Sequence, residues 1–289
     1  ISEFISSQDV RNSSKDLYKR TLKIFFNWVN DSGYKLPDLT RVEILKYKED
    51  LLASGKSSLT VGGYITSVRR FYEWVEAIKL YPNIAKGIKT PVRKQQYKKQ
   101  PLLPSQASQL LDYYTDLRDS AIINLLLRTG LRTIEIIRAN IGDIVFKGSQ
   151  RVLLIQGKGR DEKDNFVLLT DKTYKHIAEY LASRGAVRST DPLFISESNN
   201  SKGQRLTTRT ISKIAKEGLK GIGLNERSFT AHSLRHTTAV SILRSGGSLE
   251  DAQLTLRHKD PATTQIYTSF INEERRLLHS GEALIDTLY

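Results

Sequence analysis

The chain has 289 residues, 45 of them Lys or Arg against 31 Asp or Glu, so its formal net charge is +14 and its sequence pI about 9.7. Without Cys it can form neither a disulfide framework nor a thiolate metal site, and no apolar stretch approaches the roughly 18 residues needed to span a bilayer. The length favours two domains, and the charge indicates a polyanionic partner, either nucleic acid or an acidic membrane surface.

The first domain is predicted over residues 5–90, because the opening residues Ile1 to Phe4 resemble the protease-site remnant of a fusion protein. Apolar residues at helical spacing, with Ser or Thr before each run and Gly after two of them, predict a small all-helical bundle. Arg69 and Arg70 either face DNA phosphates or lie on a solvated helix face. The expected helices cover residues 9–30, 41–54 and about 58–80.

Residues 91–101 form the most basic segment for its length. They carry +4 without any acid, whereas residues 1–90 and 102–289 each carry a net +5. Prolines bound the segment and it has no apolar period, which is typical of an extended linker. It is either a solvated hinge or a strap along a phosphate backbone. Its basic residues, the candidate DNA contacts, are Arg93, Lys94, Lys98 and Lys99.

Residues 102–289 predict a mainly helical domain with one small sheet. Helices are expected within 105–138, interrupted by a turn at 128–132, and three short β-rich runs at 144–146, 151–156 and 165–169 predict a three-stranded meander. The remaining expected helices cover residues 171–183, 207–219, 230–245, 248–257, 261–268 and 272–287.

Three of the five histidines, His232, His236 and His258, fall within 27 residues. His232 and Arg235 are three residues apart and therefore share one face of a helix. A metal site is the alternative, but no carboxylate follows these histidines at i+3 or i+4, and Arg235 would repel a cation. Two permanent cations, Arg132 and Arg235, with imidazoles between them favour a phosphate site and no metal.

Four segments resemble, in order and spacing, the sequence boxes of the tyrosine recombinases, the family of phage integrases and Xer-like enzymes. They are TGLRTIEI (129–136), GKGR (157–160), HSLRH (232–236) and LRHKDPATTQIY (256–267). The resemblance covers residues from about 105 to 270, and it implies the integrase catalytic fold preceded by a helical core-binding domain. One position departs from the family pattern, which has Gly where Arg257 stands. Arg257 either adds a phosphate contact or covers the surface.

The resemblance implies that Tyr267 is a nucleophile that attacks the scissile DNA phosphate. The product is a 3′-phosphotyrosyl bond and a free 5′-hydroxyl, and because the ester conserves the bond energy, rejoining needs no ATP or other cofactor. Arg132 and Arg235 would clamp the non-bridging oxygens, and His258 would donate a hydrogen bond to them. His232 would assist removal of the phenol proton.

The remaining site residues follow from the same resemblance. Lys158, on a turn between two strands, would protonate the leaving 5′-oxygen. Lys163 is the alternative candidate for this role. Glu135 is expected to orient Arg132 or the backbone beside it, and His236 to support the site. For Glu135 and His236 a structural role is favoured over direct catalysis.

The function implied is site-specific recombination of double-stranded DNA by a tetramer on two DNA sites. The apolar tail at residues 283–289 would dock on a neighbouring protomer; packing on its own domain is the alternative. A DNA substrate implies a cytoplasmic, nucleoid-associated protein and no membrane partner. The first alternative is a type IB topoisomerase-like nicking-closing enzyme, but the small size and the Xer-like boxes argue against it. The second is a catalytically silent DNA-binding regulator, but the complete set of catalytic residue types argues against that one.

Overall fold

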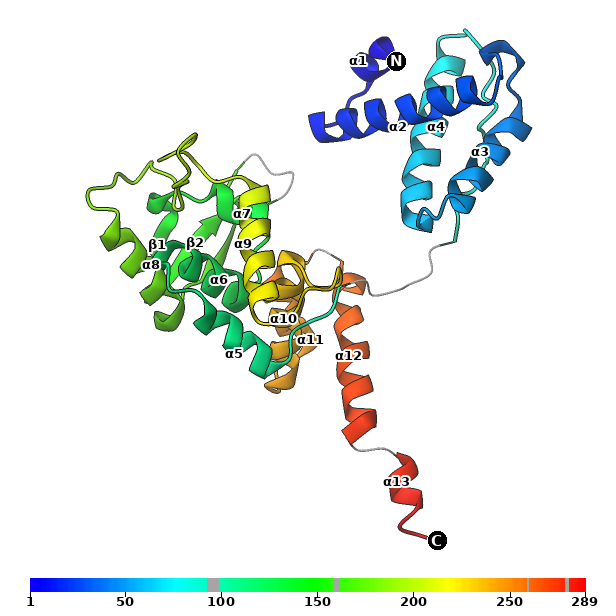
Figure 1. The fold of residues 1–289 in the computed structure, drawn as a ribbon. Coiled ribbons are helices and arrows are strands. Elements are labelled where there is room, and N and C mark those ends of the chain that lie inside the picture. Colours follow the sequence, from blue (N-terminus) through cyan, green and yellow to red (C-terminus); the bar gives the residue numbers. More distant parts are fainter. Residues whose placement is uncertain (93–98, 158–161, 259, 279–280) are drawn as a thin grey trace. The chain divides into compact units, whose positions relative to one another are not determined.

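The computed structural model describes residues 1–92, 99–157, 162–258, 260–278 and 281–289. The chain divides into two compact units, Ile1–Gln96 and Tyr97–Tyr289. Within the described ranges, no helix combines the length and the apolar character needed to cross a membrane. The chain is mainly helical with one small sheet, as the sequence predicts (Figure 1).

Unit 1 is a helical bundle whose helices begin at local capping signals. The Thr40 hydroxyl accepts a hydrogen bond from the Val42 amide at 3.2 Å, and the Glu43 carboxylate accepts one from the Thr40 amide at 2.7 Å, which satisfies free amides at the start of a helix. The three predicted helices are confirmed. The elements are α1 (Ser2–Ser7), α2 (Asn12–Asp31), η1 (Leu36–Asp38), α3 (Arg41–Ala53) and α4 (Ser58–Ala77).

The exclusion of residues 1–4 from the fold was wrong, because Phe4 belongs to the core of unit 1. Its side chain is fully buried, and its ring lies 5.6 Å from the ring of Phe71, 5.8 Å from Trp74 and 5.8 Å from Tyr18. Helix α1 thus supplies a large apolar ring to α2 and α4, and burial of such a ring contributes stability in proportion to its area.

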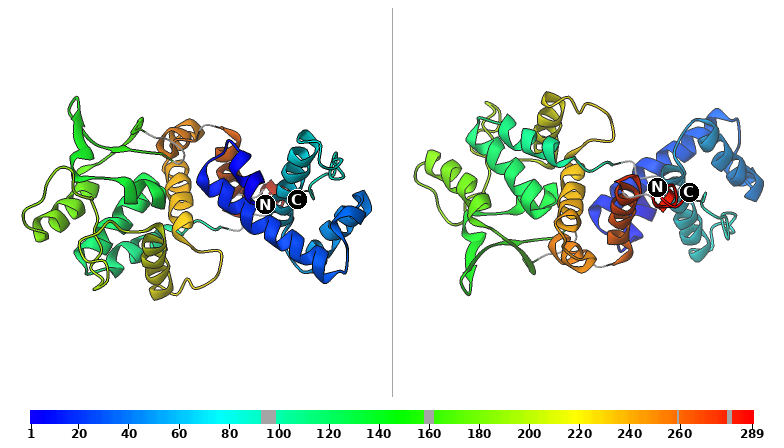
Figure 2. Two further views of the ribbon diagram at one scale, coloured as in Figure 1. Left: turned by 90° about the horizontal axis from the view of Figure 1, so that it is seen from above. Right: turned by 90° about the horizontal axis from the view of Figure 1, so that it is seen from below.

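Unit 2 contains the predicted antiparallel meander, in the order β1-β2-β3, with Ile144 opposite Leu153 and Leu153 opposite Val167. Figure 2 shows the sheet and α8 at one end of the unit and α10 to α12 at the other. The elements before the last helices are α5 (Pro104–Tyr113), α6 (Leu117–Thr129), α7 (Thr133–Arg138), η2 (Ile141–Asp143), β1 (Ile144–Lys147), β2 (Gln150–Ile155), β3 (Asn165–Leu168) and α8 (Asp171–Ser183). They are followed by α9 (Thr208–Gly221), α10 (Ala231–Arg244), α11 (Leu249–Leu256), α12 (Ala262–Leu278) and α13 (Gly281–Ile285).

Helix α6 is the centre of unit 2, since it packs against both α8 and α10 and most of its side chains are buried. It ends at Gly130, which has a φ of +60°, the left-handed conformation that glycine adopts without steric cost. A Cβ at this position would stand 2.4 Å from a methyl group of Leu256. The close approach brings the α6–α7 turn, α10 and the end of α11 together, and these elements carry the candidate site.

The last two helices were predicted at 261–268 and 272–287, and the predicted break between them was wrong. Helix α12 runs through Ala262–Leu278 without a break at 268–272, because Ile271 continues the buried stripe of Tyr267 one turn later. Beyond that stripe the apolar side chains are exposed, which does not fit packing of the tail on its own domain. The exposed residues are Leu277, Leu278, Leu284, Ile285, Leu288 and Tyr289.

Candidate active site

Arg235, on α10, is buried at the centre of the site with 2% of its surface exposed. One of its terminal nitrogens donates to the Gly130 carbonyl and the other to the Leu256 carbonyl, so the side chain ties the α6–α7 turn to the end of α11. Burial, followed by the neighbouring charges of Arg132 and Arg257, lowers the pKa of Arg235 to about 9. The guanidinium therefore stays charged at neutral pH, although it is partly destabilised and favours an anion beside it.

Arg132 stands at the N-cap of α7 and is one-third exposed. Its guanidinium lies 2.8 Å from Oε1 of Glu135, and its backbone amide donates to Oε2 of the same carboxylate at 2.8 Å. Glu135 is 1% exposed, so it holds Arg132 from behind while the cation stays open on its other side. Because both Arg132 and Glu135 belong to one capping box, short-range sequence determines this pair.

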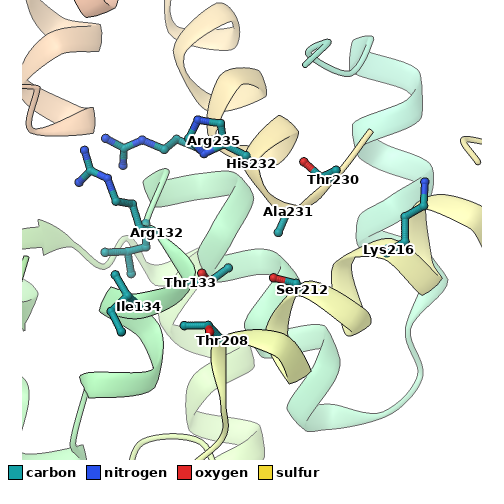
Figure 3. A pocket seen from close by; sticks show the side chains of 11 residues that line it. Arg132, Thr133, Ile134, Thr208, Ser212, Lys216, Thr230, Ala231, His232 and Arg235 are labelled. Carbon is teal, nitrogen blue, oxygen red and sulfur yellow. The ribbon is translucent and has the colours of Figure 1, made fainter. Parts of the chain in front are cut away.

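The open side of Arg132 borders a hollow of about 660 Å³ (Figure 3). Arg132 and Arg235 extend toward the same side of it, with the His232 ring beside Arg235. A second hollow of about 590 Å³ also has Arg132 in its wall, together with Glu135, Arg257 and His258. The first hollow is lined by Leu131, Arg132, Thr133, Ile134, Thr208, Ser212, Lys216, Thr230, Ala231, His232 and Arg235.

Tyr267, on α12, is 2% exposed, and its ring contacts two imidazoles. The ring centroid lies 5.2 Å from that of His236 and 6.4 Å from that of His258, and His236 in turn lies 4.7 Å from His232. Burial raises the pKa of Tyr267 to about 12, against the opposing effect of Arg235 and Arg132. The phenol therefore keeps its proton at neutral pH.

All three imidazoles are neutral at neutral pH. Burial, and then the charges around the rings, lower the pKa of His236 to about 3 and that of His258 to about 4. His232 is open to the first hollow, yet partial burial and the charges of Arg235, Arg132 and Lys99 also lower its pKa. Neutral imidazoles can accept a proton or donate a single hydrogen bond, which suits a site that already has several cations.

Thr264 is a site residue that the sequence reasoning missed. Its hydroxyl lies 2.9 Å from Nδ1 of His258, and its side chain is fully buried one turn before Tyr267. Gln253 donates to the His258 carbonyl at 3.2 Å and so holds the backbone of the same residue. The only available signal was the position of Thr264 three residues before Tyr267, which places both on one side of a helix.

Arg257 does not cover the surface, as one of the two sequence interpretations had it. Its side chain is 7% exposed and pairs with Glu135 at 3.2 Å. Its backbone has a φ of +56°, which favours the Gly found there in the family pattern. His258 follows directly and keeps its place in the site.

Two lysines were candidates for the leaving-group acid. Lys158 lies outside the described residues. Lys163 is held by Asp143, with its Nζ 2.5 Å from both carboxylate oxygens, and this ion pair is only partly exposed. Lys163 is therefore engaged in a structural contact, and Lys158 remains the candidate.

Among the predicted DNA contacts, Arg93, Lys94 and Lys98 lie outside the described residues. Lys99 donates to the Arg227 carbonyl at 2.7 Å, and its charge lowers the pKa of His232. Lys99 thus contributes to the potential of the site.

In unit 1, Arg69 lines a hollow of about 470 Å³ beside α4, whereas Arg70 is exposed and pairs with Glu73 at 2.9 Å. Among the residues that the structure describes, no group of three or more His, Asp or Glu side chains is placed to hold a metal ion.

A helical domain with a three-stranded meander, in which two arginines and three histidines gather around a buried tyrosine, defines the class of the tyrosine recombinases. Residues 100–274 match the family profile described as "Phage integrase family", and the chain belongs to this family. It is an enzyme of the site-specific recombinase class.

The chain is similar to tyrosine recombinase XerD of Oceanobacillus iheyensis, with 30% identity over 87% of this chain and 85% of that protein. It is also similar to tyrosine recombinase XerC of Thermodesulfovibrio yellowstonii, with 29% identity over 87% of this chain and 83% of that protein. Among solved structures, XerH site-specific recombinase bound to palindromic difH substrate in a post-cleavage complex shares the fold, with a TM-score of 0.75 and 20% identity over 93% of this chain and 80% of that one.

Proposed function

We propose that the protein cleaves and rejoins double-stranded DNA at a specific site through a 3′-phosphotyrosyl intermediate. The observation that carries the proposal is the position of Tyr267 in ring contact with His236 and His258, in a site that also holds Arg235 and Arg132. A phenol next to two guanidiniums is the arrangement that attack on a phosphodiester requires, because the cations stabilise the charge that develops on the phosphoryl oxygens.

Arg132 and Arg235 bind the scissile phosphate. Both line the first hollow, and Arg132 also lines the second, whose wall includes His258. The neutral His258 donates a hydrogen bond to the same phosphate, and the neutral His232 accepts the proton that the phenol releases. Lys158 protonates the 5′-oxygen as it leaves. Because Tyr267 is 2% exposed, cleavage requires α12 to shift until the phenol reaches the hollow. In the present structure, helix α12 is held in place by its packing against α10 and α11.

The test is a nicked duplex that carries the target site, identified by selection from random duplexes. The nick lets the short strand diffuse away after cleavage, so the wild-type protein should accumulate an adduct with DNA that survives denaturation. Tyr267→Phe should bind the same duplex and give no adduct. An adduct from Tyr267→Phe, or none from the wild type on its selected site, would show that the assigned chemistry is wrong.

Plasmid relaxation and strand exchange, measured beside the adduct, distinguish the two alternatives. A topoisomerase-like enzyme would relax supercoiled plasmids that lack the selected site at the rate of those that contain it. A silent regulator would bind the site and give neither adduct nor relaxation. The proposed recombinase should exchange strands only between two copies of the site.

DNA binding by this chain is supported by its net charge of +14 and by the DNA complexes of similar folds, including XerH on its difH substrate. Unit 1, with Arg69 and Arg70, and the basic segment 91–101 would grip the duplex without reading its sequence. Binding should therefore weaken steeply as the salt concentration rises.

The assembly proposed is a tetramer in which each tail docks on the next protomer. Its support is the exposed apolar tail, in which Leu284 is 70% and Leu288 75% exposed. A head-to-tail contact of this kind can close into a ring. The pair Leu284→Asp and Leu288→Asp should leave binding of one protomer to a half-site unchanged and abolish the synaptic complex on full sites, measured by sedimentation. An unchanged synaptic complex would contradict tail docking.

A further inference from the structure

Arg257 occupies a backbone position that suits glycine. It caps α11 with φ +56° and ψ +44°, and Lys79 and Arg257 are the only non-glycine residues with a positive φ in the described part of the chain. The Arg257 amide bonds to the Leu254 carbonyl at 3.0 Å and the His258 amide to the Gln253 carbonyl at 3.1 Å, which is the usual helix-ending motif with a left-handed residue. A side chain here carries a conformational cost, so its contacts must offset that cost.

The Arg257 side chain is desolvated and makes long-range contacts. It lies 3.2 Å from Oε2 of Glu135 and donates to the Thr129 carbonyl at 3.4 Å, and both acceptors are more than 120 residues away in sequence. It also donates to the nearby Thr255 carbonyl at 2.5 Å. Its Nε is buried without a hydrogen-bond partner among the described residues. The guanidinium is therefore fixed beside the α6–α7 turn, next to residues that we assign to phosphate binding.

Glu135 is shared between two arginines, since Oε1 faces Arg132 at 2.8 Å and Oε2 faces Arg257 at 3.2 Å. Counting Arg132, Arg235, Arg257 and Glu135 at their ordinary charges gives +2. Without Arg257 the buried carboxylate would pair with Arg132 alone, and the cluster would carry +1. Charge differences of this kind act strongly in a buried environment, where water screens little.

We propose that Arg257 is a positioning residue for cleavage. Arg257 holds Oε2 of Glu135, so that the Arg132 guanidinium binds only one oxygen of this carboxylate. The positive charge of Arg257 also keeps the net charge of the phosphate site at +2. It acts through Glu135 and touches neither the scissile phosphate nor Tyr267. The inference rests on the proposed function of the site, and it assigns to Arg257 a part that the recombinase sequence boxes leave open.

The first test needs no DNA and stands even if the proposed chemistry fails. Urea unfolding of the wild type, Arg257→Gly, Glu135→Gln and the double variant forms a double-mutant cycle. We expect a coupling of at least fivefold in the unfolding equilibrium constant, because each residue loses its partner when the other is changed. Additive effects would show that Arg257 does not hold Glu135. Glycine suits the φ of +56°, so Arg257→Gly should still fold.

The second test is single-turnover cleavage of the nicked duplex at saturating protein. Arg257→Gly should bind DNA within threefold of the wild type and cleave it at least tenfold more slowly. In a Glu135→Gln background the same change should cost less than threefold. A wild-type rate for Arg257→Gly would overturn the inference, and so would an equal loss in both backgrounds, which would show that Arg257 acts independently of Glu135.

Two control variants separate charge from backbone effects. Lys79→Gly releases the same backbone strain at an exposed residue of unit 1 and should leave the cleavage rate unchanged. Arg257→Lys keeps the charge and should recover most of the lost rate, whereas a rate as low as that of Arg257→Gly would overturn the charge argument. If the wild type forms no adduct, the proposed function fails, and the unfolding cycle alone decides whether Arg257 positions Glu135.

Discussion

Replacing Thr264 by valine should slow DNA cleavage although Thr264 itself does no chemistry. The hydroxyl lies 2.9 Å from Nδ1 of His258, and valine has the same shape without it. His258 is neutral, since its pKa is about 4, so only one ring nitrogen carries a proton. If the Thr264 hydroxyl donates to Nδ1, that proton is on Nε2, where it can be donated to a phosphate oxygen.

The magnitude follows from the loss of one buried hydrogen bond. Thr264 is fully buried, so His258 would lose its partner without gaining water, at a cost of about 1–3 kcal/mol. If most of that cost appears in the transition state, the cleavage rate falls roughly 5- to 100-fold, since about 1.4 kcal/mol corresponds to tenfold. Part of the cost should also appear as a lower free energy of unfolding.

The assay is single-turnover cleavage of the nicked duplex at a temperature where every variant is folded. Thr264→Ser keeps the hydroxyl and should stay within threefold of the wild type. Thr173→Val is a matched control, because it removes a buried threonine hydroxyl that lies 3.0 Å from the Thr170 hydroxyl. This variant should lower the free energy of unfolding and leave the cleavage rate unchanged. The reasoning is refuted if Thr264→Val cleaves at the wild-type rate, or if Thr264→Ser is as slow as Thr264→Val.

Three further predictions concern other parts of the chain. Phe4→Ala should lower the free energy of unfolding of unit 1 by about 3–5 kcal/mol in urea titrations, because the ring is fully buried; a change below about 1 kcal/mol would contradict its place in the core. The folded-state pKa of His236, about 3, lies below its ordinary value of 6.5, so the unfolded state binds more protons between these values and stability falls as the pH drops below about 6.5. His236→Gln should flatten this slope, by at most about 1.4 kcal/mol per pH unit, and an unchanged slope would mean that His236 is not buried in its neutral form. Lys163→Ala should cleave DNA within threefold of the wild type, whereas Lys158→Ala should lose about 100-fold or more; the reverse order would make Lys163 the acid.

Short-range sequence signals predicted most elements of this fold. The Thr40–Glu43 capping box marks the start of α3, and the alternation of β-rich runs with turns predicts the meander. Such signals depend on residues within a few positions of one another, and they failed where packing decides. Helix α12 continues through Ile271 because its stripe is buried against α10 and α11, and Phe4 is ordered by rings from α2 and α4.

By itself, the sequence determined the residue types of the site, their order along the chain and the family, because the sequence boxes are local strings. Only the tertiary structure decided how these residues meet. Arg235 reaches carbonyls 105 and 21 residues away, and Glu135 reaches Arg257 across 122 residues. Spacing along the chain carries no information about such pairs, because packed helices can be joined by loops of many different lengths. The net charge of +14 predicted a polyanionic partner. The fold places three of the chain's guanidiniums at one site.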